Sequence, residues 1–508
     1  MTKKTIPISG NDLTLGKLYQ IVYEGFEATL ASEARTRMEA SRAVVERLGA
    51  SKTAVYGVNT GFGALASVRI EPGQIRDLQF NLVRSHACGV GTPLAEDETR
   101  AMILLRANTL AKGFSGVRPV VVETLLAMLN AGVLPVIPSQ GSVGASGDLA
   151  PLAHLALVAI GEGEAIYKGE KMAGGAAMNA ARIAPLELEA KEGLALLNGT
   201  QGMLALLSLA LHEAEILSDT ADVAAALSLD ALRGTPAPFD DRIARIRPFP
   251  GHSETARNIT RLNRGSEIRE SHRSPEKDTR VQDAYSLRCT PQVHGAVRDS
   301  LSQVRTTLSI ELNAATDNPL VFAESGEVIS GGNFHGQPLA MAADQIAVAL
   351  ATLAGISERR VEHMTNPHTS LLPAFLTADP GVNSGFMIAQ VVAAALASEM
   401  KALATPHSVD TIPTSGDQED YVSMGMSAAR RLKRMLDALR NIVAIELLAA
   451  CQGIDFHAPL KTGVEARKAY DAVRAASPVV HTDRALAPDI NAVSELVSRG
   501  DFQKMLRS

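Results

Sequence analysis

A long run rich in alanine and leucine, Leu194–Leu232, carries apolar residues on nearly every face of the helix that it predicts. A helix of this kind belongs inside a bundle, because other protein must cover it on all sides. Helical texture returns in four later stretches, several of them much longer than the usual helix of about 11–12 residues: Val293–Ala314, His335–Glu362, Phe386–Ala404 and Tyr421–Cys451. We therefore expect a mainly α protein built around a central bundle of long helices.

The first 200 residues or so have a mixed pattern. Ala28–Leu48 predicts a helix, whereas Thr53–Tyr56 and Val117–Val121 are typical of short strands. Residues 234–280, which include Pro236, Pro238, Pro248 and Pro250 and end in the charged run Arg264–Arg280, predict an irregular and exposed excursion from the bundle. We expect a mixed α/β domain over residues 1–200 and the long-helix bundle, with a helical C-terminal region, over residues 201–508.

Composition narrows the class of protein. With 46% hydrophobic residues among 508, the chain can bury a large core. A net charge of −6 argues against a nucleic-acid partner. Three scattered cysteines do not form a disulfide framework, no apolar run reaches the roughly 18 residues that cross a membrane, and no zinc-binding spacing occurs. We expect a cytoplasmic protein with no metal and no membrane contact.

The stretch Gly141-Ser-Val-Gly-Ala-Ser-Gly-Asp-Leu-Ala-Pro-Leu-Ala-His154 is the most informative for function. If the chain bends tightly here, the amide nitrogen of Gly147 can attack the carbonyl carbon of Ala145. Loss of two waters, one of them from the Ser146 side chain, then leaves a five-membered ring with an exocyclic methylidene. Gly147 has no Cβ to block this approach, and the neighbouring glycines allow backbone angles that other residues avoid.

A plain glycine- and serine-rich loop before a helix is the simpler interpretation of Ala-Ser-Gly alone. A phosphate-binding loop is disfavoured, since the glycines do not match G-x-G-x-x-G. The whole fourteen-residue segment resembles the signature of the histidine and phenylalanine ammonia-lyase family. The resemblance implies that Ala145, Ser146 and Gly147 form a 4-methylideneimidazol-5-one (MIO) group with no external cofactor. It covers essentially the whole chain and implies the family's ammonia-lyase/fumarase-like helical architecture.

Two N-terminal segments extend the resemblance. Tyr56-Gly-Val-Asn-Thr-Gly-Phe-Gly63 by itself predicts only a loop, but in the family its tyrosine lies against the ring and is a candidate acid, base or amine-orienting group. His86, taken alone, is more often structural. In the family this position faces the substrate side chain, and the pair Ser85-His86 resembles that of enzymes which accept histidine.

Further candidates lie in the helical part. Asn198 suits the N-cap of the long helical run, and the resemblance adds a contact with the ring oxygen or the substrate. Tyr285 and Arg288, three residues apart, share a face of a helix or tight turn. In the family the tyrosine, on a mobile loop, is the favoured base for the β-proton, and the arginine binds the carboxylate through two parallel hydrogen bonds. Gln282, in the same segment, is a candidate for substrate binding.

The remaining candidates are loop-like. Phe334 and Asn318 resemble family residues near the ring, with turn residues that cap helices as the alternative. Glu419 suits a solvated helix N-terminus, whereas the resemblance implies that it binds the imidazole or amine of the substrate. The sequence departs from the family's pattern at Tyr421, where the histidine enzymes usually have His. Met387 is a further candidate for lining the pocket.

The resemblance implies elimination of ammonia from L-histidine to give trans-urocanate. It also implies a homotetramer in which Tyr285 and Arg288 serve the ring of another subunit, with Phe334 from a third. One alternative keeps the ring but changes the reaction, to a tyrosine or phenylalanine lyase or an aromatic 2,3-aminomutase. Another is a non-catalytic helical scaffold, which the intact candidate residues disfavour.

Overall fold

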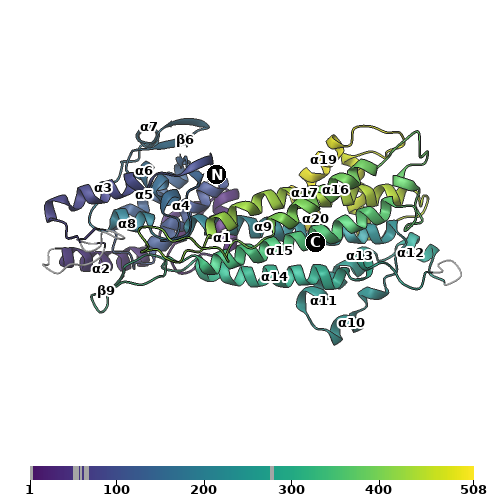
Figure 1. Cartoon of the computed structure of the whole chain (residues 1–508), viewed down its shortest axis with the longest axis horizontal. Helices are drawn as coiled ribbons and strands as arrows, with labels where there is room; N and C mark the ends of the chain where they lie inside the picture. The colour runs from purple at the N-terminus through teal and green to yellow at the C-terminus, as the bar shows by residue number, and fades with distance from the viewer. Residues whose placement is uncertain (1–3, 50–56, 58–59, 62–67, 275–279, 508) are drawn as a thin grey trace. The chain divides into compact units, whose positions relative to one another are not determined.

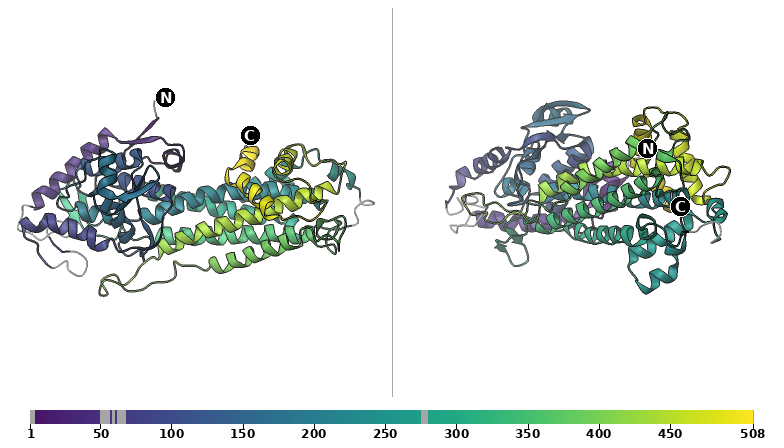
Figure 2. Two further views of the ribbon diagram at one scale, coloured as in Figure 1. Left: turned by 90° about the horizontal axis from the view of Figure 1, so that it is seen from above. Right: turned by 45° about the vertical axis from the view of Figure 1, so that its right-hand side comes forward.

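The computed structural model describes residues 4–49, 57, 60–61, 68–274 and 280–507 (Figures 1 and 2). The chain forms two compact units, and each is assembled from separate stretches of sequence. The first unit takes in Met1–Leu209, Arg305–Ala343 and Pro406–Arg430, and the second takes in Ala210–Val304, Asp344–Thr405 and Arg431–Ser508. The predicted boundary between residues 200 and 201 divides the chain into two continuous domains and remains a prediction. The two compact units are each built from non-contiguous stretches.

The first unit surrounds several small sheets with mostly short helices. Strand β1 pairs with β2 in parallel. The other pairs are antiparallel: β3 with β5, β4 with β6, β6 with β7, and β8 with β9. The elements are β1 (Thr5–Ile8), α1 (Leu15–Tyr23), β2 (Glu27–Leu30), α2 (Ser32–Gly49), α3 (Ile75–His86), β3 (Val90–Pro93), α4 (Glu96–Ala111), α5 (Pro119–Ala131), β4 (Leu134–Pro135), β5 (Pro138–Gln140), α6 (Leu149–Ala159), β6 (Glu164–Tyr167), β7 (Glu170–Ala173), α7 (Gly174–Ala180), α8 (Glu192–Leu197), β8 (Leu320–Phe322) and β9 (Glu327–Ile329).

The second unit contains the larger part of the long helices. These are α9 (Gln201–Ala231), α14 (Thr290–Glu311), α15 (Gln337–Thr365), α16 (Met387–Leu403) and α17 (Gly425–Asp455). Figure 1 shows them side by side as a bundle. Shorter helices complete the unit: α10 (Asp241–Ile246), α11 (Pro250–Leu262), α12 (Glu267–Ser271), α13 (Tyr285–Arg288), α18 (Val464–Ala476), α19 (Ala487–Ser498) and α20 (Asp501–Arg507).

A buried ionic network ties the bundle together. Arg360 on α15 donates to both carboxylate oxygens of Glu446 on α17, and both side chains are fully buried. Glu446 also accepts a hydrogen bond from Ser228 on α9 at 2.8 Å. On α14, His294 contacts Asp222 of α9 at 2.8 Å. Since a buried charge is costly unless it is paired and hydrogen-bonded, these contacts fix which helices are neighbours.

The prediction of a mainly α architecture is confirmed, and the long predicted helices correspond to α9 and α14–α17. Some details were wrong. Val117–Val121 runs into helix α5 rather than forming a strand, and the start of Ala28–Leu48 belongs to strand β2. The excursion over residues 234–280 contains helices α10–α12. The predicted strand Thr53–Tyr56 lies outside the described residues.

Within the described ranges, α15 is the one helix long and apolar enough to cross a membrane by length and composition. Its most apolar window is 67% buried inside the protein, as is usual for the core helix of a bundle. The same described ranges hold no group of three or more His, Cys, Asp or Glu side chains placed to bind a metal ion.

Candidate active site

The loop Gly141–Asp148 joins strand β5 to helix α6 and is pinned against the segment between α8 and α9. The Gly199 amide donates to the Ser146 carbonyl at 3.2 Å, and the Asp148 amide donates to the Gly199 carbonyl at 2.7 Å. Gly147 has φ +77°, and a Cβ there would lie 2.0 Å from the Gly199 carbonyl oxygen. Only glycine therefore fits at this point of the Ala-Ser-Gly sequence.

Asp148 ties the loop to the start of the long helix α9. Its carboxylate accepts hydrogen bonds from the Met203 amide at 2.8 Å and from the Ser142 hydroxyl at 3.1 Å. The side chain is completely buried. Burial raises the pKa of Asp148 to about 6, and the hydrogen bonds from Met203, Ser142 and Gly202 only partly offset that rise. The Asp148 carboxylate therefore links the loop to α9, although burying its negative charge is unfavourable.

The raised pKa predicts a pH-dependent stability that Asp148→Asn removes. Because the folded-state pKa of about 6 lies above the ordinary 3.8, the folded state binds the proton more tightly. Its contribution to stability is complete below pH 4 and disappears as the pH rises through 6. We expect the free energy of unfolding of Asp148→Asn, relative to the natural chain, to rise by about 2 kcal/mol between pH 4 and pH 7. Urea unfolding across this range measures it, and a constant difference would contradict the assignment.

A hydrophobic patch packs against the loop from residues 422–424. Ala145, Val422 and Met424 form one buried cluster, and the Met424 amide donates to the Val143 carbonyl at 2.9 Å. A Cβ on Gly144 would lie 2.2 Å from the Ser423 hydroxyl oxygen. The segment just before α17 thus packs closely on the residues that would form the ring.

His86 ends helix α3 and is half-buried. Its Nδ1 lies 2.8 Å from the Leu82 carbonyl oxygen, so Nδ1 carries the proton and Nε2 of the neutral ring is an acceptor. Just beyond it, the Gly89 amide donates to His154 Nε2 at 3.1 Å, and Val90 pairs with Gln140. These contacts bring the segment after His86 to the strand from which the Gly141 loop starts.

Asn198 is buried beside the loop, immediately before Gly199. The prediction that it caps the N-terminus of the long helix was wrong: it is the C-cap of α8, and α9 begins at Gln201. Its Nδ2 donates to Asp317 and to the Asn318 carbonyl, both at 3.1 Å. Its Oδ1 is buried with no hydrogen-bond partner in the described part of the chain.

Glu419 lies in a hairpin-like loop rather than at a helix N-terminus, so that alternative was wrong. It exchanges backbone hydrogen bonds with Thr414, whose hydroxyl also donates to its carboxylate at 2.7 Å. Nearby, the ring of Tyr421 stacks on His335, with centroids 6.1 Å apart. His335 follows Phe334, which is half-buried. Residue 421 therefore contacts the segment that carries Phe334.

Tyr285 and Arg288 form the ends of the four-residue helix α13 in the second unit. They share a face, as predicted, with the guanidinium carbon 4.5 Å from the centre of the tyrosine ring. Tyr285 is 70% exposed, whereas Nε of Arg288 is buried with no hydrogen-bond partner among the described residues. Arg288 and Gln282 line one cavity of about 370 Å³. The exposed Tyr285 therefore lies beside the Arg288 guanidinium, one N–H of which has no partner among the described residues.

The candidates divide between the two units. His86, Ser146, Asn198, Phe334 and Glu419 belong to the first unit, together with the loop and Asn318. Gln282, Tyr285, Arg288 and Met387 belong to the second. Tyr56 lies outside the described residues.

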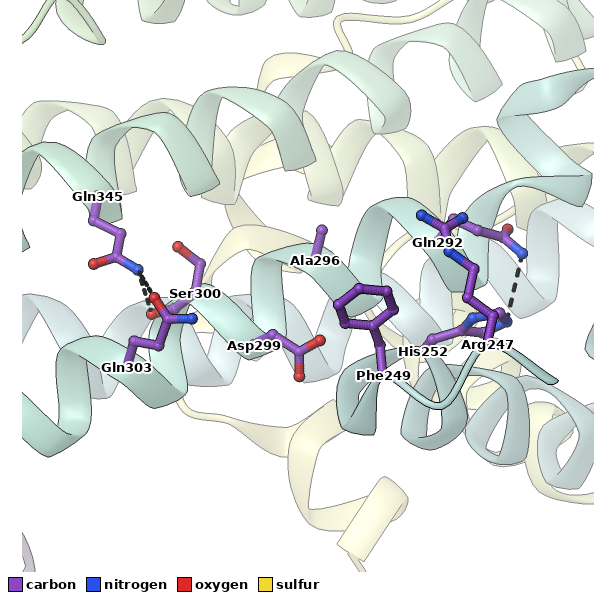
Figure 3. Close-up of a pocket in the computed structure, with 9 residues that line it drawn as sticks. All are labelled: Arg247, Phe249, His252, Gln292, Ala296, Asp299, Ser300, Gln303 and Gln345. Atoms are coloured by element: carbon purple, nitrogen blue, oxygen red, sulfur yellow. Dashed lines mark hydrogen bonds between the residues drawn. The ribbon is translucent and has the colours of Figure 1, made fainter. Parts of the chain in front are cut away.

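A different cavity of about 290 Å³ lies in the second unit along helices α11, α14 and α15 (Figure 3). Arg247, Phe249 and His252 line it on one side, and Gln303 and Gln345 lie at the other end. None of the predicted site residues is among its lining residues. This cavity is therefore not the candidate active site.

Three buried ionic residues near Asn198 were not predicted from the sequence. Lys191 and Asp317 form an ion pair at 2.6 Å with both side chains fully buried. Arg106, also fully buried, donates to the Asn198 carbonyl at 2.8 Å and to Gln201 at 2.7 Å. Burial lowers the pKa of Arg106 to about 10. No motif marks these residues, because they are far apart in sequence and each has an ordinary local setting.

The loop, its glycine contacts and the polar residues around it are those expected of an ammonia-lyase. A family model described as aromatic amino acid lyase matches residues 13–475, and the chain belongs to this family. A histidine ammonia-lyase of Koribacter versatilis is 54% identical over 99% of this chain and 100% of its own length. The solved structure of histidine ammonia-lyase from Trypanosoma cruzi has a TM-score of 0.91 and 43% identity, covering 99% of this chain and 95% of that one.

A tyrosine aminomutase from Streptomyces globisporus is nearly as similar. Its structure has a TM-score of 0.94 and 40% identity, with 99% of this chain and 98% of that one covered. The fold is therefore shared by lyases and aminomutases, so the reaction must be argued from the site. The family resemblance and the prediction of a lyase that breaks a carbon–nitrogen bond are confirmed.

Proposed function

We propose that this chain is a histidine ammonia-lyase, which converts L-histidine into trans-urocanate and ammonia without oxidation. The observation that carries the proposal is the loop Ala145-Ser146-Gly147, held by contacts that admit only glycine at position 147. Relatives bearing that name are 49–54% identical to this chain along nearly its whole length. The pair Ser85-His86, with the acceptor Nε2 of His86, suits a substrate that carries an imidazole N–H.

The residues around the loop fit an MIO group made from Ala145, Ser146 and Gly147. Gly144 and Gly147 both have positive φ, as a tight bend of the backbone requires. Asn198 next to the loop has a buried polar oxygen with no described partner, which is available to a ring or to its substrate. When formed, the ring supplies an electrophilic carbon that binds the substrate amine and makes it a better leaving group.

The other residues would bind the substrate and move its proton. Arg288 holds the carboxylate through two parallel hydrogen bonds, using donors such as its unpaired Nε. Tyr285, on the same face of α13, takes the β-proton, and Gln282 contacts the substrate beside it. Fixing the carboxylate in advance orients the β-carbon toward the base. In the first unit, Glu419 and His86 bind the imidazole, Phe334 packs near the ring, and Tyr56 serves as an acid, a base or an amine-orienting group.

A panel of L-histidine, L-tyrosine and L-phenylalanine tests the proposal. Ammonia, the unsaturated acid and any β-amino acid are measured together in each reaction. We expect ammonia and urocanate from L-histidine. Formation of a β-amino acid would instead identify an aminomutase, and ammonia from L-tyrosine or L-phenylalanine would identify a lyase for that amino acid. Tyr421, which stands where the family's histidine enzymes usually have His, is the observation that keeps these alternatives. No reaction with any of the three would contradict all of these candidates.

Replacing His86 with leucine should weaken the use of histidine far more than it weakens the fold. Loss of a hydrogen bond to a buried polar group of the substrate costs about 1–3 kcal/mol, or roughly 5- to 150-fold in kcat/KM. Because His86 is half-buried at the end of α3, thermal unfolding should change little. Ser139→Ala, on strand β5, is a control for a local change in the first unit. If the preference for histidine over tyrosine stays the same, His86 does not bind the side chain.

We further propose a cytoplasmic homotetramer with active sites shared between subunits. Free thiols at all three cysteines suit a reducing compartment. In the second unit, helices α15 and α16 expose large apolar residues, among them Val348, Ile388 and Val391, each at least half exposed. Such a patch is typical of a surface covered by another subunit, and closed symmetric assemblies are the usual form.

Complementation tests the shared sites. Inactive Ser146→Ala chains and inactive Tyr285→Phe chains are mixed, unfolded and refolded together. Shared sites predict partial recovery of activity, because some sites in mixed tetramers then receive both intact residues. Refolding each variant alone is the control. No recovery, when mass spectrometry shows that the subunits have mixed, would mean that each site is built within one chain.

A further inference from the structure

The buried ion pair of Lys191 and Asp317 is also hydrogen-bonded to Asn198, and this contact indicates a function for the pair. Lys191 Nζ lies 2.6 Å from one carboxylate oxygen of Asp317, and both side chains are fully buried. Such a pair is weak evidence for stability, because the cost of removing two charges from water offsets their attraction. The other oxygen of Asp317 accepts hydrogen bonds from the Asn318 amide at 2.7 Å and from Asn198 Nδ2 at 3.1 Å.

These contacts determine which way the Asn198 amide is turned. Nδ2 donates to Asp317 and to the Asn318 carbonyl, so both of its hydrogens face acceptors. In the flipped orientation, Oδ1 would instead face a carboxylate and a carbonyl, which repel it. The observed orientation leaves Oδ1 as a buried acceptor without a hydrogen-bond partner in the described part of the chain. An unpaired buried acceptor is costly, which suggests that a donor arrives from elsewhere.

The position of Asn198 places this acceptor beside the reactive loop. Its neighbour Gly199 is hydrogen-bonded to Ser146 and Asp148 on both sides of Gly147. Its own carbonyl accepts from the buried guanidinium of Arg106 at 2.8 Å. Backbone and side chain of Asn198 are therefore both held, each by a buried charged group, in the same unit as the loop.

We propose that Lys191 and Asp317 are positioning residues of this enzyme, which fix the Asn198 amide so that its Oδ1 accepts a hydrogen bond from the amino group of the substrate. Lys191 balances the charge of Asp317, Asp317 selects the orientation of the amide, and Asn198 makes the contact. A substrate amine carries N–H donors, whereas its carboxylate carries none, so the acceptor also distinguishes the two ends of an amino acid. The inference rests on the proposed function.

The test removes the pair while keeping the volume, with the double variant Lys191→Met/Asp317→Leu. Replacing a buried pair by apolar residues of similar size is often neutral for stability. We expect a folded chain that is still lighter by two waters, with kcat/KM for L-histidine lower by about 10- to 100-fold. The same double change made in Asn198→Ala should have an effect of less than about 3-fold, because the residue through which the pair acts is already gone. Arg474→Met/Asp455→Leu, which removes a pair of the second unit, controls for the loss of two charges.

Three outcomes would overturn the inference. One is a folded double variant with the ring and near-normal kcat/KM, which makes the pair purely structural. Another is that the double change lowers kcat/KM by the same factor in Asn198→Ala as in the natural chain, which means that the pair does not act through Asn198. Should the double variant fail to fold, Lys191→Met/Asp317→Asn keeps a polar partner that allows both amide orientations, and normal activity there counts against the inference. Failure of the proposed function shows separately, as a natural chain that releases no ammonia from L-histidine.

Discussion

The variant Ser146→Ala should fold, lack the ring and lose nearly all activity. The second of the two waters comes from the serine hydroxyl, so without it the dehydration cannot finish. Ser146 is only half-buried, and its backbone carbonyl, not its side chain, receives the hydrogen bond from Gly199. The fold should therefore tolerate alanine. Removing the reactive group of an active site typically costs on the order of 10³-fold or more in kcat.

Intact mass and ultraviolet absorbance measure this result. The natural chain should be lighter than its sequence by two waters, and the Ser146→Ala chain should not. Ser139→Ala, on strand β5 just before the loop, is the control, since it removes a nearby hydroxyl and leaves Ser146 able to react. Turnover near the natural rate in Ser146→Ala would reject the MIO assignment altogether.

Tyr285→Phe should leave the ring intact and lower kcat by roughly 10²- to 10⁴-fold, the usual contribution of a positioned acid or base. The change removes one oxygen from a ring that is 70% exposed, so the free energy of unfolding should stay within about 0.5 kcal/mol. The stacked contact of Arg288 with the ring remains possible in phenylalanine. KM should therefore change much less than kcat, because the group that holds the carboxylate is still in place.

Tyr167→Phe provides the matched control for Tyr285→Phe. It makes the same chemical change on strand β6, where Lys168 Nζ lies 5.1 Å from the centre of the tyrosine ring. Equal activities of the two variants would remove Tyr285 from the mechanism. The base would then be sought among the other tyrosines, with Tyr56 the next to test.

Hydrophobic pattern alone predicted the bundle, since a helix as apolar as α9 or α15 can be stable only inside one. The pattern failed where tertiary contacts decide. Val117–Val121 has the β-branched residues of a strand, yet Pro119 starts helix α5 there. The break of the helical run at Asn198–Thr200 follows from hydrogen bonds to Arg106 and Asp317, which lie far away in sequence.

For the candidate site, too, local sequence patterns predicted some residues and long-range contacts decided others. A local motif revealed Ser146, and helical spacing placed Tyr285 and Arg288 on one face. By contrast, the acidic run around Glu419 gave no sign of the hairpin, because its partner is the side chain and backbone of Thr414. Lys191 and Asp317 are 126 residues apart, and only the folded chain makes them a pair.

The loop at Ala145–Gly147 is covered by chain that is synthesised much later. Met424, which holds the Val143 carbonyl, follows Asp148 by roughly 280 residues, and at about 5–20 residues per second a ribosome needs on the order of 15 to 60 s to make them. Until then the nascent loop lacks the hydrophobic contact with Val422 and Met424. We therefore expect the proposed ring to form only late in the maturation of each new molecule, and an N-terminal fragment released early to carry the three residues without the ring.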